Sequence, residues 1–256
     1  MNTEELDEWG ADFLQFSARF ADVFGRKEPR AQATKYLRGL MASVPRKNGW
    51  QVAEVIGDRT PDATQRLLYQ AKWSADTARD RLLQYVIEVF GEEDGIAVVD
   101  ETGFIKRGTR SVGVKRQYSG TAGKVENCQI GTFLSYATAK GHVFLDRRLY
   151  LPEKEWCNDL ERREQAKVPA EVVFQTKPEQ AMAMLEHAWQ AGVPMRWVVG
   201  DEVYGGSPRL RDLIARHEYW YVLTVKTPTP VWTERPQVVG PCLLYTSDAA
   251  DELRSV

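Results

Sequence analysis

The stretch IAVVDETGFIKRG, residues 96–108, contains the pattern from which the fold can be inferred. Four apolar residues, a run typical of a buried strand, lead into the acidic pair Asp100 and Glu101, and the cations Lys106 and Arg107 follow a Thr-Gly turn. A second stretch, WVVGDEVYG at residues 197–205, repeats the order of an apolar run and then an acidic pair, beginning with Asp201. If the two strands are parallel neighbours, Asp100 and Asp201 emerge at the same edge of a sheet.

Two carboxylates this close need a cation between them. Without one they repel each other, and one of them takes up a proton. Mg²⁺ prefers hard oxygen ligands, usually one or two carboxylates with water and phosphate oxygens. The pattern therefore favours a metal site with Asp100 and Asp201 as ligands, while solvated strand-end aspartates are the alternative. Because neighbours on a strand point to opposite faces, we do not assign Glu101 or Glu202 to the metal and expect them to support the site or to be solvated.

The rest of the chain predicts a helical part followed by an α/β part. Five helices are expected within residues 11–91, and the boundary falls near Gly91–Gly95. Beyond it, the predicted order is strand 96–101, strand 128–138, strand 142–151, helix 177–192, strand 194–206, helix 207–218 and strand 219–225, with an irregular excursion at 153–176. Early strands joined by short links suit an antiparallel meander, and later strands alternating with helices suit parallel crossovers. This is the order of the ribonuclease-H-like α/β fold, although other α+β folds remain open.

The bulk composition excludes several classes of protein. The 256 residues are 43% hydrophobic and 27% charged, with a formal net charge of −2, which is ordinary for a soluble protein of one or two domains. Three cysteines and three histidines are too few and too scattered for a disulfide framework or a zinc site. No apolar run approaches the roughly 20 residues that cross a bilayer, so we expect a cytoplasmic protein without a membrane segment. The AVVDE run also resembles an ATPase strand, but the P-loop that it would need upstream is missing.

Basic residues cluster directly after the first acidic pair. Residues 104–124 hold six cations, four glycines and no acid. Such a loop suits a phosphate backbone, although a solvated basic loop is the alternative. The predicted DNA contacts are Lys106, Arg107, Lys115, Arg116 and Lys124.

Residues 49–73 also resemble a helix-turn-helix in which Thr64, Gln65, Arg66 and Tyr69 would face a groove, but short helix pairs are common.

The end of the chain has an unusual composition. Residues 242–252, CLLYTSDAADE, match the translation of a transposon-based sequencing adapter. We therefore expect the chain to be truncated near Pro241, with its own C-terminal part missing, and residues 242–256 to be a non-native tail that takes no part in the fold. A genuine acidic tail is the alternative.

Several long strings together resemble a known family. Residues 98–131, which run from VVDETG to NCQIG, and DEVYG at 201–205 resemble a bacterial insertion-sequence transposase of the DDE superfamily endonuclease group. Residues 24–41 and 46–68 resemble the N-terminal segment of such a protein. The resemblance extends over roughly residues 15–235. It implies an all-helical N-terminal domain at 1–93 with a DNA-binding role and, at 94–241, a ribonuclease-H-like catalytic core with a mixed sheet and flanking helices.

The resemblance also implies a function. It implies cleavage and rejoining of transposon-end phosphodiester bonds by two-metal-ion chemistry with Mg²⁺ or Mn²⁺, acting on double-stranded DNA of transposon ends and target, with a homodimer in the DNA complex and a nucleoid-associated location. Asp100 takes the place of the first acid and Asp201 that of the second. The third acid is a glutamate on a later helix, but Glu234 is too close to the last strand and Glu252 lies in the suspected tail. We therefore expect an incomplete, inactive fragment. A catalytically inactive DNA-binding protein derived from a transposase is the alternative.

Overall fold

The computed structural model describes residues 3–229, so Glu234 and the suspected tail at 242–256 lie outside the described residues. The helices are α1 (Thr3–Ala18), α2 (Lys27–Met41), α3 (Gly49–Val55), α4 (Asp62–Tyr69), α5 (Ala75–Phe90), α6 (Leu160–Gln165), α7 (Lys177–Gln190), α8 (Glu202–Gly205) and α9 (Pro208–Arg216), with shorter turns η1 (Ala21–Val23), η2 (Gly120–Ala122) and η3 (Glu153–Cys157). The strands are β1 (Ile96–Ile105), β2 (Lys115–Ser119), β3 (Lys124–Thr138), β4 (Gly141–Tyr150), β5 (Trp197–Gly200) and β6 (Trp220–Leu223).

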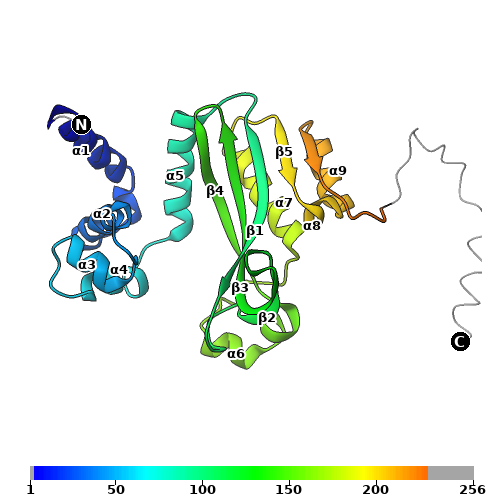
Figure 1. Ribbon diagram of the computed structural model, residues 1–256, viewed down its shortest axis with the longest axis horizontal. Helices are drawn as coiled ribbons and strands as arrows, with labels where there is room; N and C mark the ends of the chain where they lie inside the picture. Colours follow the sequence, from blue (N-terminus) through cyan, green and yellow to red (C-terminus); the bar gives the residue numbers. More distant parts are fainter. Residues whose placement is uncertain (1–2, 230–256) are drawn as a thin grey trace, which may run out of the picture. The chain divides into compact units, whose positions relative to one another are not determined.

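The strands form one mixed sheet (Figure 1). Its order is β2-β3-β1-β5-β6, and β4 also pairs with β3. The long strand β3 pairs antiparallel with β2 along its first part, with β4 along its later part, and with β1 on its other side. β1, β5 and β6 are parallel. The mixed sheet with flanking helices, preceded by a helical region, confirms the predicted α/β class and is consistent with the ribonuclease-H-like fold.

Helices α7, α8 and α9 pack on one face of the sheet. Ala97 and Val99 of β1 and Val198 of β5 share a core with residues of these helices, including Met184 and Tyr204. The alternation of strand side chains places every second residue in this core. α7 begins with a capping box between Thr176 and Glu179, which fixes where its first turn lies. The helices before Gly91 differ from the sheet in secondary structure as expected, although contacts join the two parts into one unit over residues 1–224.

Two stretches expected to be irregular pack together in a lobe with its own small core. Val114, Leu151, Trp156 and Cys157 are buried there, and Trp156 Nε1 donates a hydrogen bond of 2.9 Å to the carbonyl oxygen of Val114. The Arg162 guanidinium stacks 3.8 Å from the Trp156 ring centroid and donates to the carbonyl oxygen of Thr109 at 2.5 Å. Arg162 thereby ties the basic loop to α6. The apolar residues of this core are too widely spaced in the sequence to give a periodic signal.

A buried ion pair joins α5 to the sheet. The pairing of β4 with β3 shifts register between Leu134 and Ser135, and the resulting bulge turns both Leu145 and Asp146 inward. The Asp146 side chain is 1% exposed. Arg79 Nη1 donates to its two oxygens at 3.2 and 3.3 Å. Arg147 Nη1 also lies 3.2 Å from Asp146 Oδ1, so the buried carboxylate has two compensating charges, of which Arg79 is the less exposed.

We expect Asp146→Ala to lower the free energy of unfolding by about 1.5–3 kcal/mol, because it removes the buried acceptor of Arg79, which keeps the more exposed Asp76 and Asp80 as partners. The matched control is Asp22→Ala, which breaks an ion pair with Arg81 in which both side chains are about half exposed. The control should leave the urea midpoint close to that of the unaltered chain. Urea denaturation followed by tryptophan fluorescence measures both. Equal shifts for the two variants would contradict a special role for the buried pair.

Candidate functional site

The two aspartates that the sequence singles out lie side by side at the carboxyl ends of neighbouring strands. β1 and β5 pair in parallel up to Val99 opposite Gly200, so the next residues in register are Asp100 and Asp201. One oxygen from each of Asp100, Glu101 and Asp201 falls within a cluster whose atoms are all within 4.8 Å of one another. Within residues 3–229, this is the group of His, Cys, Asp and Glu side chains whose spacing suits a metal ion.

In each aspartate, one carboxylate oxygen accepts a hydrogen bond from a nearby backbone N–H. Asp100 Oδ1 accepts a hydrogen bond of 2.7 Å from the backbone N–H of Glu101. Asp201 caps α8, and its Oδ1 accepts one of 2.9 Å from the N–H of Val203. For the part of the chain that the structure describes, no hydrogen bond engages either Oδ2, and both residues are exposed. Two oriented carboxylates on a solvent-accessible rim fit Mg²⁺ or Mn²⁺, which retain water and phosphate ligands beside one or two carboxylates.

Glu101 points toward the helices, away from solvent. Its Oε1 lies 2.5 Å from Lys177 Nζ, and its Oε2 accepts a hydrogen bond of 2.9 Å from the Tyr204 hydroxyl. Of the two expectations for Glu101, solvation does not hold, because its side chain is 17% exposed and has two partners. Burial and the neighbouring Glu101 carboxylate raise the pKa of Tyr204, so its hydroxyl remains protonated and donates. The side chain of Glu202, by contrast, is exposed.

Sequence reasoning missed both partners of Glu101. Tyr204 belongs to the quoted DEVYG string, but nothing in the string indicates that its hydroxyl returns to β1. Lys177 is 76 residues from Glu101 in the sequence, and only the fold unites them. Gly205 completes this arrangement, because a Cβ at that position would lie 1.8 Å from the carbonyl oxygen of Thr224. The backbone of α8 can therefore approach the end of β6 only with glycine there.

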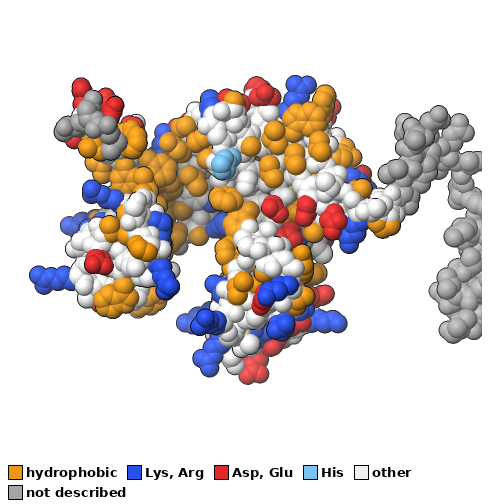
Figure 2. Space-filling view, viewed as in Figure 1, with side chains coloured by type: hydrophobic (Ala, Val, Ile, Leu, Met, Phe, Trp, Pro, Cys, Tyr) orange, Lys and Arg blue, Asp and Glu red, His pale blue; other side chains and the backbone are white. Residues whose placement is uncertain are grey.

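The five predicted DNA contacts differ in their surroundings. Lys115 Nζ is paired with Glu155 at 2.6 Å, and Lys124 Nζ with Glu126 at 3.0 Å. Lys106, Arg107 and Arg116 form no ion pair with any residue of the described part. Figure 2 shows Lys and Arg side chains, interspersed with acids, gathered over the lobe that carries β2 and α6. A cleft of about 970 Å³ in this lobe is lined by Arg110, Lys115, Arg116 and Arg162 among others.

One of the four residues proposed to face a DNA groove is misplaced. Thr64 is 1% exposed, and its hydroxyl accepts a hydrogen bond of 3.2 Å from Gln32 Nε2. The prediction that Thr64 faces a groove is therefore wrong, because the packing of α2 against α4 buries it. Gln65, Arg66 and Tyr69 are exposed on α4.

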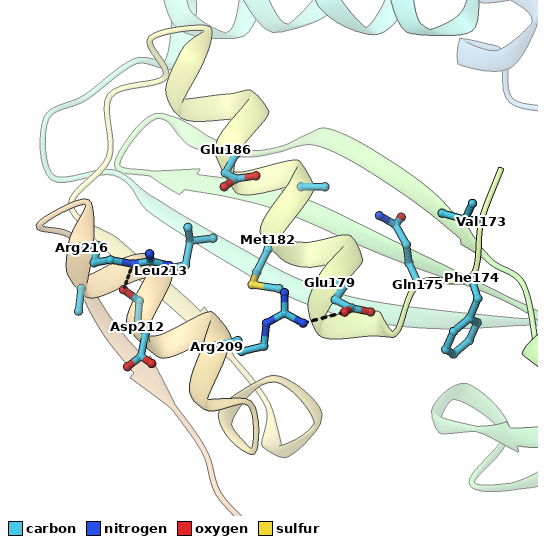
Figure 3. Close-up of a pocket in the computed structure, with 12 residues that line it drawn as sticks. Val173, Phe174, Gln175, Glu179, Met182, Glu186, Arg209, Asp212, Leu213 and Arg216 are labelled. Carbon is cyan, nitrogen blue, oxygen red and sulfur yellow. Dashed lines mark hydrogen bonds and ion pairs between the residues drawn. The ribbon is translucent and has the colours of Figure 1, made fainter. Parts of the chain in front are cut away.

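A second groove lies away from the acidic cluster. It has a volume of about 960 Å³ and runs between α7 and α9 (Figure 3). Arg209 Nη1 is paired with Glu179 Oε1 across it at 3.0 Å, and Asp212 and Arg216 lie farther along α9. None of the three clustered acids lines this groove, so it does not extend the candidate metal site.

None of the helices in the described residues combines the length and the apolar character that a membrane crossing requires.

Comparison with known proteins identifies the family. A family model described as DDE superfamily endonuclease matches residues 19–243. The probable transposase for insertion sequence element IS701 from Microchaete diplosiphon is 27% identical over 178 residues, which make up 69% of this chain and 43% of that relative. The chain thus aligns with less than half of the relative's length. Because the family model covers most of the chain, including both strands that end in aspartate, the chain belongs to the DDE superfamily endonuclease family.

Proposed function

We propose that this chain carries the first two metal-binding carboxylates of a DNA transposase, Asp100 and Asp201, in a ribonuclease-H-like catalytic core that occupies residues 94–241. The observation that carries the proposal is the parallel register of β1 and β5, which brings oxygens of the two aspartates within 4.8 Å. Membership in the family and the likeness to an insertion-sequence transposase support the reaction class.

Asp100 and Asp201 are both oriented for a cation and accessible to DNA. The backbone hydrogen bonds to Asp100 and Asp201 orient both carboxylates and leave Oδ2 of each for Mg²⁺ or Mn²⁺. When bound, a pair of such ions activates the attacking oxygen and stabilises the leaving oxygen of a phosphodiester. Because both side chains are exposed, a DNA phosphate can reach them without any movement of the helices.

The basic residues of the neighbouring lobe would position double-stranded DNA, at transposon ends and at the target. Lys106, Arg107 and Arg116 are available for phosphate contacts as they stand, whereas Lys115 and Lys124 must first release Glu155 and Glu126. Arg162 supports the loop at Thr109 and so helps to present these cations. The helical region at 1–93, with Gln65, Arg66 and Tyr69 exposed on α4, is a second candidate for DNA contact.

A complete centre needs a third carboxylate. Glu101 is engaged by Lys177 and Tyr204, and the described residues bring no further acid into the cluster. We therefore infer that the third acid lies outside them and that residues 3–229 alone do not catalyse strand cleavage. Rejoining of DNA, a homodimer on DNA and a cytoplasmic, nucleoid-associated location belong to the same proposal for the whole protein. If the whole protein has no such acid, the second candidate applies, a catalytically inactive DNA-binding protein derived from a transposase.

We expect Asp100→Ala and Asp201→Ala each to weaken Mn²⁺ binding at least about tenfold, since each removes one of two carboxylate ligands. Isothermal titration calorimetry of the full chain measures the affinity. Asp212→Ala is the control, because Asp212 is an exposed acid on α9 outside the cluster, and it should leave the affinity unchanged. Equal affinities for all three variants and the unaltered chain would contradict the ligand assignment and favour the inactive DNA-binding protein.

We expect Arg107→Ala to weaken binding of a short DNA duplex and to reduce the slope of log affinity against log salt by about 1, the loss of one phosphate contact. Fluorescence anisotropy at several salt concentrations gives both quantities. Lys140→Ala is the matched control. Lys140 lies in the turn after β3, whereas the basic loop adjoins the start of that 15-residue strand, so the two sites are roughly 45 Å apart along it. A control that loses as much affinity as Arg107→Ala would count against the basic loop as the DNA surface.

A further inference from the structure

Glu101 is a third carboxylate beside the proposed metal site, but both of its oxygens are occupied. Lys177 Nζ lies 2.5 Å from Oε1, and the Tyr204 hydroxyl donates to Oε2 at 2.9 Å. The exposed fractions of the Glu101 and Lys177 side chains are 17% and 20%, and Tyr204 is fully buried. Solvent therefore competes poorly for these contacts.

The partners of Glu101 come from the helical side of the sheet. Lys177 is the first residue of α7, and Tyr204 belongs to α8, which packs in the main core. Asp100 precedes Glu101 on β1, and alternation along the strand turns their side chains to opposite faces. Asp100 therefore faces solvent at the edge of the sheet, whereas the contacts that fix Glu101 come from the helices. One oxygen of Glu101 nevertheless remains within the 4.8 Å cluster.

We propose that Lys177 binds Glu101 as a charge-balanced pair, so that the centre offers a divalent cation two ionised carboxylates rather than three. Lys177 is then a positioning residue that sets cation affinity through Glu101. This inference rests on the proposed function of Asp100 and Asp201 as ligands.

Electrostatics gives the direction of the effect. A unit charge about 5 Å from a divalent cation changes affinity by at least about tenfold even with water-like screening, and by more in a partly buried site. In the unaltered chain, the positive charge of Lys177 offsets the negative charge of Glu101, 2.5 Å away. Removing the ammonium would free Glu101 to attract or ligate the cation, whereas removing the carboxylate charge would leave the ammonium to repel it.

The balance also bears on which ions and substrates the centre accepts. With only two carboxylate ligands, Mg²⁺ keeps coordination positions for water and for a phosphodiester oxygen, and its positive charge is not overcompensated by carboxylates. A third free carboxylate would suit Ca²⁺, which takes 6–8 oxygen ligands. Lys177 would therefore favour Mg²⁺ over Ca²⁺ and keep the centre open to DNA.

A double-mutant cycle on the full chain tests the proposal, with Mn²⁺ affinity measured by calorimetry. We expect Lys177→Met to bind Mn²⁺ at least about tenfold more tightly and Glu101→Gln to bind it at least about tenfold more weakly. The combined variant, Lys177→Met with Glu101→Gln, should return to within about threefold of the unaltered chain, because both charges are gone. Lys177→Arg, which keeps the charge, should retain the original affinity.

The cycle separates this proposal from its competitors. If Glu101 is a direct ligand, Glu101→Gln weakens binding and the combined variant stays weak, which overturns the proposal. If the pair is merely structural, Lys177→Met and Glu101→Gln change affinity in the same direction or leave it unaltered, which also overturns it. Urea midpoints verify that each variant folds, and Lys177→Gln replaces Lys177→Met if that variant does not. Failure of the proposed function has a different signature, since Mn²⁺ binding would then survive Asp100→Ala and Asp201→Ala.

Discussion

The parallel pairing of β1 with β5 is the constraint on which the rest of the site depends. With Val99 opposite Gly200, the chain continues on both strands into aspartate at the same level of the sheet. A slip of one residue would turn one aspartate to the other face, because side chains alternate with a period of two. The shared core of Ala97, Val99 and Val198 opposes such a slip, since it would move these side chains toward solvent. The packing that stabilises the sheet therefore also sets the geometry of the acidic cluster.

Helices α7 and α8 supply the side chains that contact Glu101 beside the two aspartates. The capping box at Thr176 fixes the first turn of α7, and the next residue, Lys177, reaches Glu101. One oxygen of Asp201 caps α8, and the other accepts no hydrogen bond from the described residues and so can bind a cation. The capping bond holds the carboxylate in place, and it also fixes the short helix that carries Tyr204 back to Glu101. Strand ends, helix starts and the acidic cluster are thus parts of one connected arrangement.

The sequence is informative about this fold wherever apolar patterns are long. The convergence of Asp100 with Asp201 follows from two matched apolar runs that each end in an acidic pair, and the alternation of helices with strands after residue 176 predicts the parallel part of the sheet. β2 was missed because KRQYS is polar and its pairing with β3 is not a local property. The helical turns in the lobe were missed for a similar reason, since their core joins segments about 40 residues apart. Thr64 was wrongly expected at a surface, and Lys177 was not anticipated, because single side-chain contacts across the fold leave no periodic trace.

The central claim is that Asp100 and Asp201 share a cation. Anomalous X-ray scattering from crystals of the chain soaked in Mn²⁺ tests it most directly, because it locates the ion independently of any activity. We expect an anomalous peak within coordination distance of a carboxylate oxygen from each aspartate, with Glu101 still paired to Lys177. A peak bound by only one of the two aspartates, or no peak at this rim in crystals that bind Mn²⁺ elsewhere, would contradict the claim.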